Sequence, residues 1–198
     1  MAVKLASIFF TMILVDNYVL VKFLGICPFL GVSKKLDSAV GMSLAVTFVM
    51  VLSTAVTWPI YTMILEPNGL AYLQTIVFIL VIAILVQLLE NVLKKYIPTL
   101  YRALGVYLPL ITTNCTILGV TILNLDEGYN FIESIVCAAG AGIGFLVAMV
   151  LFSGVRRRVE DAAPPKCFEG LPITLVSAAM VSLSFMGFGG IVEAVFGG

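Results

Sequence analysis

The sequence contains no histidine and little charge of either sign. Only 11% of its 198 residues are charged and 61% are hydrophobic, whereas a soluble domain is about a quarter charged and about half apolar. Because so few charged residues cannot cover the surface of a soluble fold, the excess of apolar residues must face lipid. The lack of histidine removes the commonest general base and a common metal ligand. A net charge of zero gives no basic footprint for nucleic acid, and we expect no nucleic-acid partner.

Six apolar runs are long enough to cross a membrane. A spanning helix needs about 20 predominantly apolar residues, and the connections between the runs are too short for a soluble domain. The sequence therefore predicts an all-α integral membrane protein with one membrane domain, residues 1–198. We expect the first run to be retained, because no cleavage site follows a short apolar core. The runs cover residues 5–32, 38–65, 71–93, 103–124, 131–155 and 171–194.

The basic residues are distributed unevenly among the connections. Connections one, three and five hold nine Lys or Arg residues, whereas connections two and four hold none. The positive-inside rule places the basic connections in the cytoplasm and both termini on the outer side. The nine residues are Lys34, Lys35, Lys94, Lys95, Arg102, Arg156, Arg157, Arg158 and Lys166.

A short motif occurs twice in the chain. Cys27–Val32 and Cys115–Val120 both read C-x-x-L-G-V, 88 residues apart, in the first and fourth apolar runs. Each half of the chain contains three runs, so the second copy enters the membrane from the opposite side. We therefore predict two inverted three-helix repeats, about 1–97 and 98–198, with a functional site where the two halves meet.

Both copies of the motif lie among helix breakers. A glycine and a proline flank Cys27, and a proline and the polar run Thr112–Asn114 precede Cys115. Such residues free backbone groups, which inside a bilayer must find protein or water partners. The first run is also long, because its 28 residues would make a helix of about 42 Å against a hydrocarbon core of about 30 Å. We therefore expect helices 1 and 4 to be broken near Cys27 and Cys115.

The symmetric cysteines admit several interpretations. A buried cysteine usually behaves as a small hydrophobe, and we assign that role to Cys137 and Cys167, which have no counterpart in the other half. A disulfide between Cys27 and Cys115 has no evident purpose in a helix bundle. Zinc takes three or four protein ligands and an iron–sulfur cluster takes four. If a cluster is the answer, a partner of similar build must supply two more thiolates.

Two stretches carry a resemblance to a known family. Residues 22–36, KFLGICPFLGVSKKL, and residues 108–115, LPLITTNC, resemble the A subunits of the Rnf ion-translocating electron transport complexes. The E subunits of the Na⁺-translocating NADH:quinone oxidoreductases are similar. The likeness covers essentially the whole chain, and the Cys-Pro-Phe and Thr-Thr-Asn-Cys variants favour Rnf.

The resemblance implies a function, a cofactor and partners. The function is that of a membrane subunit, not catalytic alone, of a ferredoxin:NAD oxidoreductase that translocates Na⁺ or H⁺ across the bacterial cytoplasmic (inner) membrane. The cofactor is a [2Fe–2S] cluster that relays electrons between cytoplasmic iron–sulfur centres and an outer flavin. The paralogous, inverted six-helix E subunit shares this cluster and supplies two cysteines. By motif match, Cys27 and Cys115 are the two iron ligands from this chain, and the other Rnf-type subunits and membrane lipid are further partners.

Polar residues inside the apolar runs are functional candidates. We single out Asp16, Lys22 and Asn114 as residues that could tune the cluster or line an ion pathway. A secondary transporter is the alternative function, because inverted repeats with broken helices also build carriers. In that case Asp16, Asn17, Thr113 and Asn114 would line a solute site and the cysteines would be incidental.

Overall fold

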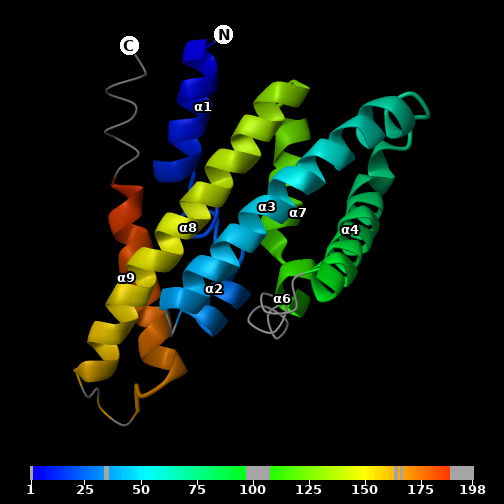
Figure 1. Ribbon diagram of the computed structural model, residues 1–198. Coiled ribbons are helices and arrows are strands. Elements are labelled where there is room, and N and C mark those ends of the chain that lie inside the picture. The colour runs from blue at the N-terminus through cyan, green and yellow to red at the C-terminus, as the bar shows by residue number, and fades with distance from the viewer. Residues whose placement is uncertain (1, 34–35, 97–107, 163–164, 166, 188–198) are drawn as a thin grey trace.

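The computed structural model describes residues 2–33, 36–96, 108–162, 165 and 167–187, and within these ranges the chain is helical and contains no strand (Figure 1). The all-α prediction is therefore confirmed for this part of the chain. Four of the predicted cytoplasmic basic residues, Lys34, Lys35, Arg102 and Lys166, lie outside the described residues. The helices are α1 (Ala2–Leu14), α2 (Ile26–Val32), α3 (Leu36–Ile60), a π-helical turn (Tyr61–Leu65), a 3₁₀ turn (Ala71–Leu73), α4 (Gln74–Tyr96), α6 (Leu108–Thr112), α7 (Cys115–Asp126), α8 (Phe131–Asp161) and α9 (Leu171–Met186).

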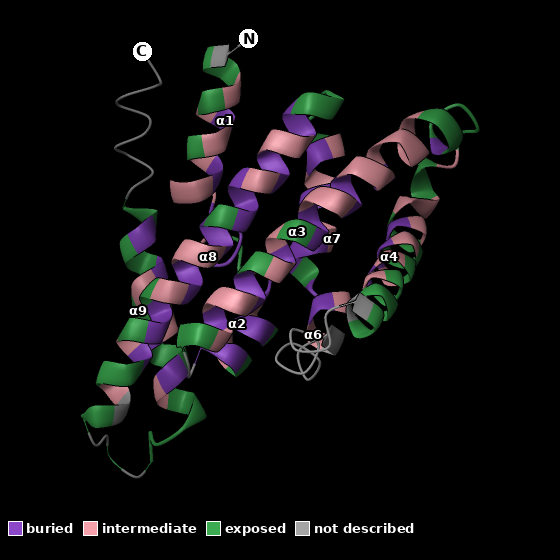
Figure 2. Cartoon of the chain, in the orientation of Figure 1, coloured by how far each residue is buried: buried purple, intermediate pink, exposed green. Residues whose placement is uncertain are grey.

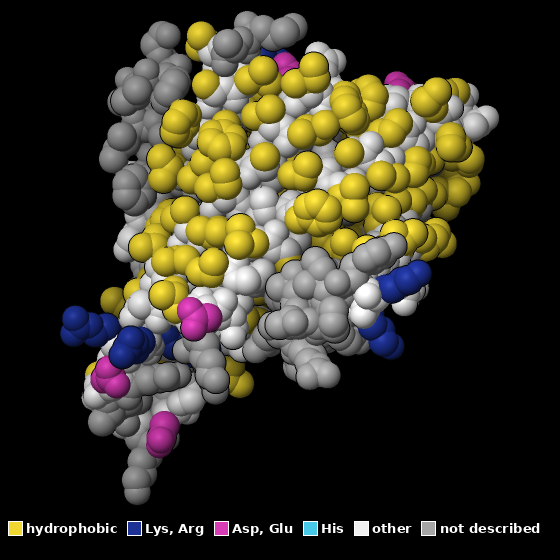
Figure 3. Space-filling view, viewed as in Figure 1, with side chains coloured by type: hydrophobic (Ala, Val, Ile, Leu, Met, Phe, Trp, Pro, Cys, Tyr) yellow, Lys and Arg dark blue, Asp and Glu magenta, His cyan; other side chains and the backbone are white. Residues whose placement is uncertain are grey.

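Three helical segments of the described chain are long and apolar enough to cross a membrane: Leu36–Leu65, Ala71–Val92 and Phe131–Val159. Shorter apolar helices cover Val3–Leu14, Leu110–Asp126 and Leu171–Met186. Hydrophobic side chains are spread over the visible face in Figure 3, and most of the visible Lys and Arg side chains lie at one end, where α4 and α8 finish. This distribution agrees with an integral membrane protein.

α8 is the central helix, and it packs most extensively against α3 and α1. Its glycines permit close approach on two sides. A Cβ atom on Gly144 would lie 2.9 Å from the carbonyl oxygen of Met12, in α1, and a Cβ on Gly142 would collide with the side chain of Thr47, in α3. Small residues at such crossings let membrane helices pack backbone against backbone.

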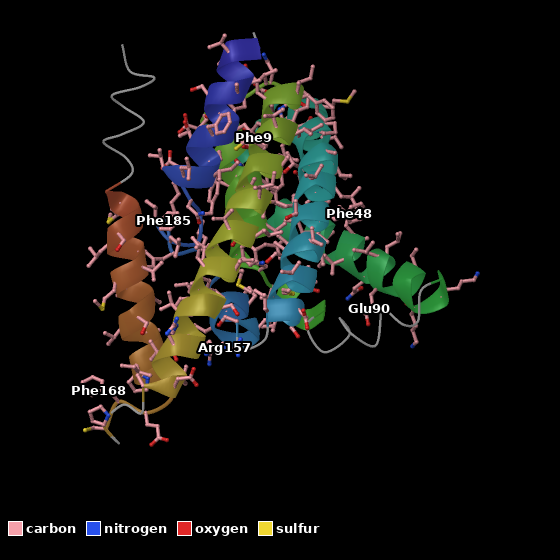
Figure 4. All side chains as sticks on the ribbon, turned by 60° about the vertical axis from the view of Figure 1, so that its left-hand side comes forward. Phe9, Phe48, Glu90, Arg157, Phe168 and Phe185 are labelled. Atoms are coloured by element: carbon pink, nitrogen blue, oxygen red, sulfur yellow. The ribbon has the colours of Figure 1, made fainter. Side chains whose placement is uncertain are left out.

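The buried residues form one core between α1, α3, α7 and α8, whereas α4 is largely exposed (Figure 2). Figure 4 shows Phe9 of α1 on the side of α8, and Phe48 of α3 pointing away from the core. Many of the exposed residues of α4 are large and apolar. They include Ile76, Ile79, Leu80, Ile84 and Leu88, so this face needs lipid or another protein to cover it.

Candidate functional site: two helix breaks in contact

The first break separates α1 from α2. Residues 15–25 form turns rather than regular helix, and the fully buried side chain of Asn17 organises them. Its Nδ2 donates to the carbonyl oxygens of Gly144 at 2.9 Å and Ile13 at 3.2 Å, and its Oδ1 accepts from the amides of Val19 at 3.0 Å and Leu20 at 3.3 Å. One side chain thus makes four hydrogen bonds to backbone groups, two of them to amides within the break, and polar backbone groups in an apolar setting need such partners.

α9 supports the same break from the other side. The hydroxyl of Ser182, in α9, donates a hydrogen bond to the carbonyl oxygen of Leu20. The chain then enters α2 through Gly25, whose φ of 79° is in the left-handed region that favours glycine.

The second break separates α6 from α7 and is capped by Asn114. Its side-chain oxygen accepts from the amide of Thr116 at 3.0 Å, which is the usual role of an asparagine before a helix. Asn114 and Thr116 are both buried. Asn114 Nδ2 and Thr116 Oγ1 have no hydrogen-bond partner among the described residues.

The two breaks touch each other. A Cβ atom on Gly25 would collide with Thr116 Oγ1 and would lie 3.1 Å from Asn114 Oδ1, so only a glycine fits here. Next to it, the side chain of Leu24 packs against Gly119 of α7. The expectation of a break near each motif cysteine is therefore met, and the contact between the breaks brings the two motifs to one part of the molecule.

Cys27 and Cys115 each lie within two residues of this contact along the chain, in the first turn of the helix that follows a break. Cys27 is the second residue of α2, Cys115 is the first residue of α7, and both are exposed. Cys137 is buried in the core, as expected of a packing residue. The same prediction for Cys167 is wrong, because this residue is exposed in the turn between α8 and α9.

Asp16 and Lys22 belong to a different place from Asn114. They line a cavity of about 230 Å³ with Thr11, Asn124 and Glu127, between α1 and α7, and neither motif cysteine is part of its lining. Lys22 Nζ lies 3.9 Å from a carboxylate oxygen of Asp16 and 5.1 Å from the ring centre of Tyr18. Asn114 instead lines a cavity of about 340 Å³ between α4 and α7, together with Cys115.

Two residues near the site could not be singled out from the sequence. Arg156 of α8, which the sequence indicated only as a topology determinant, is buried and donates to the carbonyl oxygen of Leu30 at 2.6 Å and to Ser33 Oγ at 2.8 Å. Phe152, one turn earlier, stacks on Phe29 of α2 with ring centres 4.2 Å apart. No local pattern distinguishes Arg156 from its exposed neighbours.

Comparison with known proteins gives one consistent family. A family model described as "Rnf-Nqr subunit, membrane protein" matches residues 5–192. The A subunit of the Na(+)-translocating ferredoxin:NAD(+) oxidoreductase complex of Acetobacterium woodii is 56% identical over 94% of this chain and 97% of its own length. The A subunits of ion-translocating oxidoreductase complexes of Syntrophotalea carbinolica and Aliivibrio salmonicida are 52% and 55% identical. Each covers 91% of this chain, and the matches extend over 93% and 94% of those relatives. The chain therefore belongs to the Rnf-Nqr family of membrane subunits.

Proposed function

We propose that this chain is the A-type subunit of a ferredoxin:NAD oxidoreductase complex that translocates Na⁺ or H⁺, and that it relays electrons through a [2Fe–2S] cluster shared with a paralogous subunit. The names of its relatives support the first part, since they are A subunits of ion-translocating oxidoreductase complexes. The two exposed thiols at the paired break support the second part. The chain would be one part of an enzyme, without catalytic activity alone.

The donor set of this chain fits half of such a cluster. The all-cysteine form needs four thiolates, and Cys27 and Cys115 supply two. In the described part of the chain, no group of three or more His, Cys, Asp or Glu side chains could complete a metal site. A partner must then supply the other two thiolates, and the inverted six-helix E subunit is the partner we propose. When bound, the cluster would supply one-electron transfer within the membrane.

The residues around the cysteines are suited to a negatively charged group. Buried negative charge is costly in an apolar medium, and a cluster with four thiolates is anionic. The twelve-residue helix α7 begins at Cys115, so the positive end of its dipole lies beside this ligand. On the inner side, the ring of Phe145 would lie 3.2 Å from a Cβ atom on Gly25, so the contact between the breaks is closed by apolar packing.

The inverted-repeat plan is part of the same proposal. One break occurs in each predicted half, and each is followed by a helix that carries a motif cysteine in its first turn. We propose six spans, both termini on the outer side, and a location in the bacterial cytoplasmic membrane. The basic ends of α4 and α8, which finish at one end of the molecule in Figure 3, support this orientation.

The alternative solute site receives less support. Asp16 and Asn114, which a transporter would bring together, line different cavities. Asn17 uses both ends of its amide to hold the first break. Two of the four predicted solute ligands are therefore separated, and a third is engaged in structure.

The test is electron transfer and ion uptake by the complete complex in membrane vesicles, with Cys27→Ser beside Cys167→Ser. Cys167 is the matched control because it is also exposed but lies far along the chain from either break. We expect Cys27→Ser to lose both ferredoxin-dependent reduction of NAD and the accompanying ion uptake, and Cys167→Ser to retain both. Full retention in Cys27→Ser would contradict the proposal.

A further inference from the structure

The helix that carries Cys27, α2, is too short to be stable without contacts to neighbouring elements. α2 has only seven residues, and an isolated helix shorter than about 12 residues is marginal even in favourable sequences. It follows Gly25, whose left-handed backbone turns the chain sharply. The position of Cys27 therefore depends on the elements that pack against α2.

α8 contacts α2 through two side chains, which lie one turn apart on α8. Phe152 and Phe29 stack with an interplanar angle of 24°, and both are buried. Four residues later, Arg156 Nη1 donates to Leu30 O and Ser33 Oγ. Residues four apart lie on one face of a helix, so these two side chains form a continuous support along α2.

Two hydrogen bonds of Arg156 are directed to the end of α2. The carbonyl of Leu30 is among the last four of this helix, which have no partner within it. A cation at that end is favourable because the helix dipole is negative there. Arg156 is only 8% exposed, and a guanidinium does not lose its proton in proteins. It is therefore a permanent positive charge inside the protein.

We propose that Arg156 is a positioning residue for the cluster ligand Cys27, and that its fixed charge raises the reduction potential of the shared cluster. Leu30 is three residues after Cys27, a rise of about 4.5 Å along the helix axis. Reduction adds an electron to an anionic cluster, and a nearby buried cation stabilises the added charge. This inference rests on the proposed function, because it concerns the cluster held by Cys27.

The test is an EPR-monitored redox titration of the complete complex, carried out for Arg156→Gln, Arg156→Lys and Arg157→Gln. Arg157 is the control because it is the next residue of α8, is exposed (labelled in Figure 4), and its change alters net charge by the same amount. We expect the midpoint potential of Arg156→Gln to be lower than that of Arg157→Gln by at least about 59 mV, which corresponds to a tenfold change in the equilibrium constant of a one-electron reduction. Arg156→Lys keeps the positive charge, so its midpoint potential should stay close to that of the parent. Equal potentials in Arg156→Gln and Arg157→Gln would overturn the inference.

A second variant covers the case in which Arg156→Gln does not assemble. Ser33→Ala removes one acceptor of Arg156 and keeps the charge, so we expect iron to be retained and the g values of the cluster to shift. Parental g values in Ser33→Ala would then overturn the positioning role. Cys27→Ser separates the two levels of the proposal. If no EPR signal is lost in Cys27→Ser, the proposed function is wrong. If a signal is lost in Cys27→Ser but does not change in the Arg156 variants, only this inference is wrong.

Discussion

At the scale of single residues, the site depends on side chains that replace missing helical hydrogen bonds and on one side chain that is absent. Asn17 satisfies the backbone on both sides of the first break, and Asn114 caps the helix after the second. Gly25 has no side chain, and this is what allows the second break to lie against the first. The sequence revealed the breakers but not this contact, because residues 25 and 116 are distant in the chain.

Gly25→Ala should disrupt the contact between the breaks. The alanine would have to adopt the left-handed backbone conformation of Gly25, which L residues avoid at a cost of about 1–2 kcal/mol. The collision of its Cβ with Thr116 Oγ1 should add about 1–3 kcal/mol of overpacking. We expect a clear fall in the thermal unfolding temperature of the purified complex and loss of iron.

The matched control for this change is Gly31→Ala in α2. A Cβ added to Gly31 would have no atom of a neighbouring element within 4 Å, and an alanine favours a helix interior over glycine by about 1 kcal/mol. The complex should be as stable as the parent or slightly more so. An equal loss of stability in both variants would show that the glycine contact is not the cause.

Polar candidates at the residue scale could be predicted only in part. Asn114 does lie beside Cys115 at the second break. Asp16 and Lys22 were singled out as residues that could tune the cluster or line an ion pathway, and they share a cavity between α1 and α7 whose lining includes neither motif cysteine. The sequence could not place this cavity, because residues 15–25 turn repeatedly instead of continuing α1 as one helix. Arg156 could not be predicted, since its acceptors lie at the end of α2 and in the residue after it, about 125 residues earlier in the chain.

At the scale of elements, α8 is the common support of the site. Its glycines admit α1 on one side and α3 on another, and its last turns hold α2 through Phe152 and Arg156. The apolar runs predicted that helices would be present, because their length and composition are local properties. They could not predict which faces would meet, because small residues are spread throughout α8.

Gly144→Ala tests the crossing of α1 and α8. The added Cβ would lie 2.9 Å from the Met12 carbonyl and 3.2 Å from the Asn17 amide nitrogen, so it should force α1 outward and disturb the first break. We expect destabilisation of about 1–3 kcal/mol, measured as a lower unfolding temperature of the complex. Gly154→Ala, in the same helix with nothing within 4 Å, should leave that temperature unchanged or higher. A stable Gly144→Ala complex with parental iron content would refute the close crossing.

At the scale of the whole molecule, the chain is a membrane protein whose surface requires other molecules. α4 exposes apolar residues along much of its length (Figure 2), and both motif cysteines are exposed. The composition predicted the membrane setting, because scarcity of charge is a property of the whole chain. The two motif cysteines are equally visible in the sequence, but the partner that the proposed cluster requires is not.

The proposed orientation predicts which side of the membrane Cys167 faces. Cys167 is exposed in the fifth connection, which the positive-inside rule places in the cytoplasm. A membrane-impermeant maleimide should therefore label it in inverted vesicles and not in intact cells. Glu127→Cys in a Cys167→Ser background, exposed after α7, should give the opposite pattern. Labelling of Cys167 from outside intact cells would reverse the proposed topology.

The most direct test of the central claim is iron content and low-temperature EPR of the complete complex with Cys27→Ser, Cys115→Ser and Cys167→Ser beside the parent. If the paired break holds a [2Fe–2S] cluster, each of the first two variants should lose the same EPR signal and about two irons per complex, and Cys167→Ser should lose neither. If Cys27→Ser and Cys115→Ser keep the parental iron and spectrum, these cysteines do not bind the cluster, and the paired break has another purpose.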